Sequence, residues 1–222
     1  MRSYPGGDGT GQPQPRRQRA LSLDDIADLR AYEHEREGFR RRIIELKRLR
    51  RVGVGPLVSL VFENRDTVRF QVQEMVRAER MLSDELVLAE LEVYNPLIPD
   101  PGELSATMLL ELTDEDQLRE WLAKLVGIER AAYLRLGALG PDPARQDGGL
   151  VIRCQVDAAH ATQLTREEVT ASVHYVRFLL GEDEVGAFAD GPVWLGIDLP
   201  EYAHEVELAG GVRAELLDDL RQ

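Results

Sequence analysis

Residues 62–80 read FENRDTVRFQVQEMVRAER and join the end of an apolar strand to a charged helix. We expect this helix to begin near Asp66, whose carboxylate can cap it. At about 100° per residue, Glu79 falls at the centre of an apolar face, Gln71 on its edge and Glu74 further round. That face consists of Val68, Val72, Met75, Val76 and Leu82. The residues expected to point away from it are Arg69, Gln73, Arg77 and Arg80.

The two neighbouring helices also place charges among apolar residues. A helix expected from Ser22 to Arg50 has a heptad-like seam that Arg36 interrupts. The seam is Leu29, Tyr32, Arg36, Phe39, Ile43, Leu46 and Arg50. A third helix, capped by Ser83, places Glu90 inside an apolar face. A buried charge is costly unless it is paired, so Arg36 either reaches water along the seam or pairs with an acid. Glu79 is the first candidate partner and Glu90 the alternative.

These positions define a candidate polar cluster. Its members are Arg36, Glu63, Asn64, Arg65, Gln71, Glu74, Glu79 and Glu90. It is either a structural Arg–Glu network or the lining of a binding site, and no catalytic residue is assigned. Carboxylate-bridged metal sites in helical bundles use Glu-x-x-His, but Arg77 stands at that spacing from Glu74. The histidines and Cys154 match no zinc spacing, so we expect no metal and no cofactor.

The whole chain has 222 residues, a formal net charge of -13 and 43% hydrophobic residues. That charge argues against a nucleic-acid or anionic-membrane partner. We find no apolar run of the roughly 18 residues that a membrane span needs, and residues 1–20 lack the apolar core of a signal peptide. A single cysteine precludes an internal disulfide and fits a reducing cytoplasm.

The order of patterns along the chain predicts an α+β fold. Residues 1–20 are expected to form a disordered arm and residues 21–222 a single domain, in which a long N-terminal helix and a helix pair pack on a mainly antiparallel sheet with further short helices. Strands are expected at 52–62, 104–112, 131–136, 150–156, 170–180, 193–199 and 206–208. Later helices are expected at 114–126, 182–189 and 212–220. The strand at 52–62 is nearly continuously apolar, as in strands buried on both faces.

Several runs resemble the uncharacterised family called domain of unknown function 3501. They are residues 47–56, 62–65, 71–80, 94–99, 104–108 and 173–178. The Gln-x-Gln-Glu-Met block at residues 71–75 is specific to that family, and the resemblance covers residues 21–222. The family has no established activity. Its members are often bacterial, and their genes often lie near those of rubrerythrin-like proteins and an iron–sulfur oxidoreductase.

The resemblance therefore implies a non-catalytic accessory or assembly partner of an iron-containing redox or peroxide-stress system. The residues themselves support a second interpretation, a small-ligand-binding protein or enzyme whose polar pocket lies at residues 62–80. A third interpretation is a carboxylate metal protein. A deep polar pocket favours the second interpretation, whereas a wide exposed apolar patch favours the first.

Overall fold

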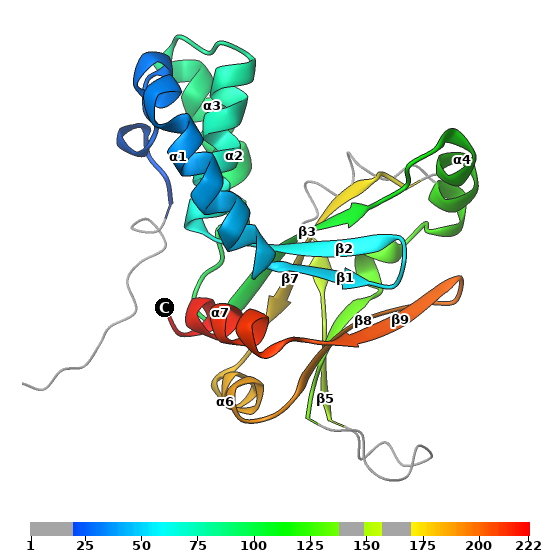
Figure 1. The fold of residues 1–222 in the computed structure, drawn as a ribbon. Helices are drawn as coiled ribbons and strands as arrows, with labels where there is room; N and C mark the ends of the chain where they lie inside the picture. The colour runs from blue at the N-terminus through cyan, green and yellow to red at the C-terminus, as the bar shows by residue number, and fades with distance from the viewer. Residues whose placement is uncertain (1–19, 138–148, 157–169) are drawn as a thin grey trace, which may run out of the picture.

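The computed structural model describes residues 20–137, 149–156 and 170–222. The arm expected at residues 1–20 lies outside these ranges except for Ala20, as do residues 138–148 and 157–169. The α+β class is confirmed: helices accompany two antiparallel sheets, rather than one. Three helices stand together at one end of the molecule and project away from the sheets (Figure 1).

The N-terminal helix is divided in two. A short 3-10 helix, η2 (Leu23–Asp25), precedes α1 (Leu29–Arg48). Ser22 begins η2, whereas the Asp28 carboxylate caps α1 by accepting hydrogen bonds from two backbone amides, at Arg30 and Ala31. The continuous helix expected from Ser22 was therefore wrong, because a second capping residue restarts the chain in a new direction.

The next helix, α2 (Arg65–Ala78), also begins earlier than expected. Asn64, and not Asp66, is its cap: the Asn64 side chain accepts from the amides of Asp66 at 3.1 Å and Thr67 at 3.0 Å. Helix α3 (Asp84–Tyr94) follows after a short loop and leads into the 3-10 helix η3 (Asn95–Leu97). Helices α1, α2 and α3 form the projecting helical unit.

The strand expected at 52–62 is a hairpin of β1 (Arg51–Val54) and β2 (Val58–Glu63). The chain reverses at Gly55, which has φ 71°, a conformation that glycine adopts without steric cost. The Tyr202 hydroxyl donates to the Val54 carbonyl at 2.7 Å and accepts from the Leu57 amide at 2.9 Å. Tyr202 thereby ties this turn to the second sheet.

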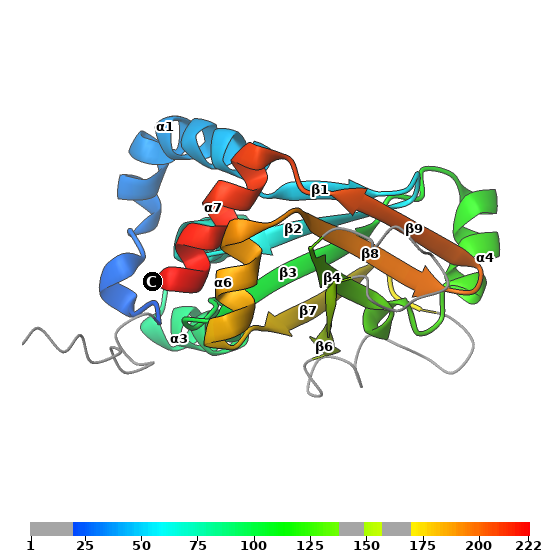
Figure 2. The same ribbon diagram turned by 90° about the horizontal axis from the view of Figure 1, so that it is seen from below.

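The five-stranded sheet has the order β1-β2-β3-β7-β6, and the four-stranded sheet β5-β4-β8-β9. The remaining strands are β3 (Glu103–Leu110), β4 (Ala132–Leu136), β5 (Leu150–Arg153), β6 (Gln155–Val156), β7 (Val173–Leu179), β8 (Val193–Leu199) and β9 (Tyr202–Glu207). The remaining helices are α4 (Glu115–Lys124), η4 (Ile128–Arg130), α6 (Glu182–Asp190) and α7 (Gly210–Arg221). The strand expected at 150–156 divides at Cys154, and its two halves join different sheets. Helices α6 and α7 pack together beside the sheets (Figure 2).

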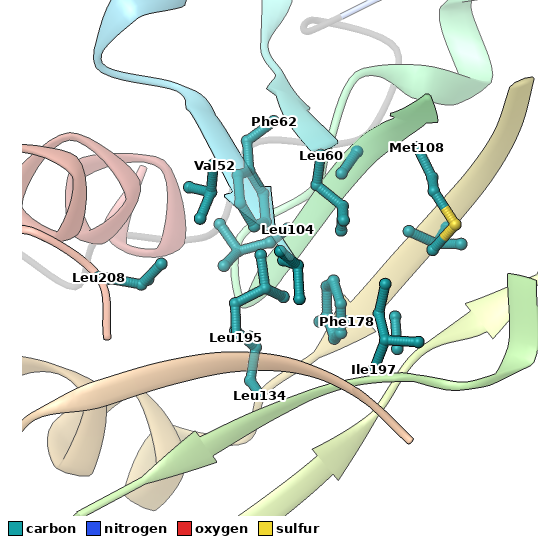
Figure 3. Packing of buried hydrophobic residues seen from close by; sticks show 14 of the residues in the cluster. Val52, Leu60, Phe62, Leu104, Met108, Leu134, Phe178, Leu195, Ile197 and Leu208 are labelled. Atoms are coloured by element: carbon teal, nitrogen blue, oxygen red, sulfur yellow. The ribbon is translucent and has the colours of Figure 1, made fainter. Parts of the chain in front are cut away.

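The main core lies between the two sheets (Figure 3). Leu60 and Phe62 of β2 face Leu195 of β8 and Leu134 of β4, with Phe178 of β7 between them. All six residues of β2 are buried, as expected for a strand covered on both faces. Alternate residues of β2 face the opposite way, toward the helical unit, and there they form part of a pocket. In the ranges that the structure describes, no helix is long and apolar enough to span a membrane.

Candidate functional site

A pocket of about 390 Å³ lies between the helical unit and the outer face of the five-stranded sheet. Its floor follows from strand alternation, because residues two apart in a strand share a face. Val61, Thr107 and Tyr175 lie side by side on β2, β3 and β7. The floor as a whole is Val61, Glu63, Thr107, Leu109, Val173 and Tyr175. The even-numbered neighbours of these residues, such as Leu60 and Met108, belong to the core between the sheets.

The walls come from three helices. Helix α2 contributes Val68 and Gln71, the end of α1 contributes Lys47, and Tyr94 and Leu97 come from the junction of α3 with η3. The start of α2 stands against the pocket floor because α2 begins immediately after β2, at the Asn64 cap. The wall and the floor are thus joined by the residues between Glu63 and Val68, inside the segment that the sequence singled out.

Glu63 connects the pocket floor to the first turn of α2. It is 8% exposed, and its two carboxylate oxygens accept from the hydroxyls of Thr67 at 2.5 Å and Thr107 at 2.6 Å. The Thr67 hydroxyl also accepts from the Asn64 amide at 2.9 Å. Buried carboxylates are tolerated when hydrogen bonds satisfy them. Glu63 therefore holds α2 in place on β2 and β3 and adds a negative charge to the floor.

Three other polar groups of the pocket are available to a ligand. Among the described residues, the Lys47 ammonium, the Gln71 amide and the Tyr94 hydroxyl form no side-chain hydrogen bond or ion pair. Burial raises the pKa of the Tyr175 phenol, and the nearby Tyr94 and Glu63 add to that rise. The Tyr175 hydroxyl is thus kept protonated at neutral pH. Apolar walls with a few convergent polar groups are typical of small-molecule sites.

The structure brings only part of the candidate polar cluster to this pocket. Glu63 and Gln71 line it, Asn64 caps α2, and Arg65 pairs with Asp25 at 2.5 Å at the side of the helical unit. Arg36 pairs with Glu74, whereas Glu79 was the expected partner. Their contact is bidentate, with both nitrogen–oxygen distances at 2.8 Å, and the Tyr32 hydroxyl donates to the same carboxylate at 2.6 Å. The Arg36 guanidinium, aided by Tyr32, holds the pKa of the Glu74 carboxyl below its ordinary value.

Glu79 lies elsewhere because α2 ends at Ala78. Arg80 takes φ 52°, a left-handed conformation that a helix cannot continue, and Glu79 becomes an exposed cap. The expectation that Glu79 lies in a buried stripe was wrong. Glu90 is half-buried, and its pKa is raised by burial and by the nearby Glu79. These two carboxylates therefore mark a separate acidic surface on the outside of the helical unit.

Sequence reasoning missed three polar positions, of which Gln73 and Arg50 are buried and Thr107 is half-buried. Gln73, which was expected to point outward, is fully buried, and its amide accepts from the Ala27 amide at 3.0 Å and donates to the Ala27 carbonyl at 2.9 Å. Arg50 is also fully buried and pairs with Asp219 of α7. Thr107 could have been noticed as a polar residue on the face of β3 that carries Leu109. Arg50 stood on the expected seam, but its partner Asp219 is distant in the sequence. Gln73 gave no such signal, because its partner Ala27 lies on another element.

In the described ranges, no three His, Cys, Asp or Glu residues gather closely enough to hold a metal ion. Cys154 is half-buried, and burial raises the pKa of its thiol to about 11. A thiol with such a pKa is almost wholly protonated at neutral pH and is a poor nucleophile.

Comparison with known proteins gives a family and a fold relative. A family model described as "Protein of unknown function (DUF3501)" matches residues 20–220. A crystal structure described as a novel protein of unknown function from Burkholderia pseudomallei K96243 is 33% identical, with a TM-score of 0.78. The similarity covers 90% of this chain and 99% of that chain. No curated protein sequence matches the chain.

Proposed function

Because the chain belongs to the DUF3501 family, whose description assigns no activity, we propose a function from the pocket. The protein binds a small amphipathic molecule between α2 and the five-stranded sheet. Such a ligand has an apolar body for the floor and an anionic or hydrogen-bonding group for Lys47, Gln71 and Tyr94. The observation that carries the proposal is a pocket of about 390 Å³ lined by three polar groups that have no hydrogen-bond or ion-pair partner among the described residues.

The chemistry of the pocket narrows the ligand. The apolar floor residues Val61, Leu109 and Val173 favour a flat or branched hydrocarbon portion. The pocket volume falls in the range of roughly 300–1,000 Å³ that is common for small-molecule sites. Among the described residues of the lining, Lys47 is the one cation, so an anionic group of the ligand would pair with it.

The probe that tests this is 8-anilinonaphthalene-1-sulfonate, a fluorescent dye with an aromatic body and one sulfonate. We expect one dye to bind per chain. Leu109→Trp, which fills the floor, should abolish that binding, and Lys47→Gln should weaken it. Leu86→Ala, on the exposed side of α3, is the matched control and should leave binding unchanged. Circular dichroism confirms that each variant is folded.

Equal dye binding by the wild-type chain, Leu109→Trp and Lys47→Gln would overturn the proposal. Loss of binding in Leu86→Ala alone would place the dye on α3 and would also overturn it. Native mass spectrometry of the purified protein gives an independent measurement, since a ligand retained from the cell appears as a discrete mass increment that Leu109→Trp removes.

A second candidate function is the accessory or assembly partner of an iron-containing redox system that the family resemblance implies. The observation that favours a protein partner is the row of exposed apolar side chains on α3. Chemical cross-linking in the native cell, followed by mass spectrometry, tests it. Cross-links from α3 to a rubrerythrin-like or iron–sulfur protein would support this function, and cross-links confined to unrelated proteins would refute it.

A further inference from the structure

Helix α3 exposes an apolar stripe to solvent. The α3 stripe consists of Leu82, Leu86, Ala89 and Val93, in which Leu82 lies just before the helix. Leu82 is 85% exposed, Leu86 53% and Val93 50%. The inner face of the helix is different, because Val87 and Leu91 are buried against the rest of the helical unit. The exposed stripe is therefore a second apolar face, which the described residues leave uncovered.

The spacing of the α3 stripe is that of a coiled-coil seam. The intervals from Leu82 to Leu86, Ala89 and Val93 are four, three and four residues. Leu86, Ala89 and Val93, which lie within the helix, occupy the a, d and a positions of a heptad, where apolar side chains pack into a second helix, and Leu82 extends the apolar surface just before the helix begins. A helix is thus the partner element that this spacing fits.

The residues that flank the stripe are acidic on both sides. Glu85 and Glu92 occupy g positions, and Glu90 occupies the e position between them. Helix α3 contains no lysine or arginine. Charges at e and g set which helices pair and in which orientation. A partner that complements α3 therefore carries basic residues at those positions.

A second copy of α3 fits poorly. In a parallel pair, g positions face e positions, and in an antiparallel pair like positions face each other, so glutamate opposes glutamate in both. The net charge of -13 on each whole chain adds to this repulsion. Charge complementarity thus favours a different, basic protein.

We propose that the α3 stripe docks an amphipathic helix of another protein, with an apolar a/d seam flanked by lysine or arginine. The proposal extends the second candidate function by giving the chemistry of the partner. It does not depend on the ligand pocket, since no residue of the α3 stripe lines that pocket. Helix α3 has 11 residues and is about 17 Å long, so the contact is short and suits a reversible association.

Two synthetic helical peptides of about three heptads test the proposal. Both have leucine at a and d; one has lysine at e and g, and the other glutamate. Like charges keep each peptide from pairing with itself. Fluorescence anisotropy with the full chain should show binding of the lysine peptide, weakening as salt is raised, and no binding of the glutamate peptide.

Two exposed leucines of α3 provide a matched pair of variants. Leu86→Ala removes a stripe residue, whereas Leu88→Ala removes a leucine that is 45% exposed but lies at a c position, outside the stripe. Leu86→Ala should weaken lysine-peptide binding by about tenfold or more, and Leu88→Ala by no more than about twofold. Since both variants keep the charge of the chain, unspecific attraction to an acidic protein affects them equally.

Charge reversal completes the test. The triple variant Glu85→Lys, Glu90→Lys, Glu92→Lys should prefer the glutamate peptide. An unchanged preference, equal effects of the two leucine variants, or no binding of the lysine peptide would each overturn the proposal. So would a wild-type dimer, seen by analytical ultracentrifugation, that Leu86→Ala dissociates, because it would identify a second copy as the occupant. Dye binding in the ligand pocket is measured separately and does not change with these outcomes.

Discussion

Replacing Arg50 by methionine should be among the most destabilising single substitutions in this protein. The Arg50 side chain has no exposed surface. It donates to the carbonyls of Phe62 at 2.8 Å and Glu63 at 3.0 Å, at the end of β2. It also pairs with Glu215 at 2.8 Å and with Asp219 on α7. One guanidinium therefore joins the end of α1, the β1–β2 hairpin and the C-terminal helix.

The magnitude follows from what the substitution leaves behind. In Arg50→Met, the buried Asp219 carboxylate loses its cation and two buried carbonyls lose their donors. Breaking one member of a buried ion pair costs about 3–5 kcal/mol. Since domains are stable by only about 5–15 kcal/mol, this is a large fraction of the free energy of unfolding. Removing both charges, in Arg50→Met with Asp219→Leu, should restore part of the loss, because the buried unpaired carboxylate is then gone and the remaining one, Glu215, is half-buried and can reach water.

Equilibrium unfolding in urea, followed by circular dichroism, measures these changes. Arg48→Met is the matched control, because Arg48 is exposed and pairs with Glu45 on the surface at 2.8 Å. That control should change the free energy of unfolding by less than about 1 kcal/mol. If Arg50→Met unfolds within about 1 kcal/mol of the Arg48→Met control, the reasoning from burial is refuted. A double variant no more stable than Arg50→Met alone would show that the Asp219 charge is not the cause.

Three further predictions concern the helical unit and its chemistry. Gln73→Leu should cost about 1–3 kcal/mol in the free energy of unfolding, because it leaves the Ala27 amide and carbonyl unpaired. The control Gln71→Leu, at an exposed position of α2, should cost little, and equal losses in urea unfolding would contradict the prediction. Because the pKa of Glu74 is lowered, its pairing with Arg36 stabilises the fold fully above the ordinary carboxyl pKa, and this stabilisation is lost as pH falls through the lowered pKa. The difference in free energy of unfolding between the wild type and Glu74→Gln should therefore narrow on acidification. A difference that widens would refute the pairing. Elemental analysis of protein purified without chelator should find no stoichiometric iron, zinc or manganese, and about one metal per chain, lost in Glu74→Gln, would contradict that expectation.

Local pattern determined most element types. The alternation at 104–112 and 193–199 became β3 and β8, and the acidic start at Glu182 became α6, because these signals act between residues close in the chain. The near-continuous apolar run of β2 correctly indicated burial on both faces. Two of the polar residues that the sequence singled out at the junction of β2 and α2, Glu63 and Gln71, line the pocket.

The tertiary structure alone decided the register and the partners. Whether α2 ended before or after Glu79 turned on one left-handed residue, Arg80, and this single residue moved Glu79 from an expected core position to the surface. Arg36 pairs with Glu74 instead of the expected Glu79 because of the way in which α1 and α2 pack. Periodicity within each helix does not specify that packing.

The same limit explains the pocket and the buried arginine. Lys47, Thr107 and Tyr175 come from α1, β3 and β7, and only strand pairing and helix packing bring them together. Arg50 meets Asp219 across 169 residues of sequence. Local sequence sets the type and the faces of each element through interactions over a few residues, but which faces meet depends on burial and charge pairing summed over the whole folded chain.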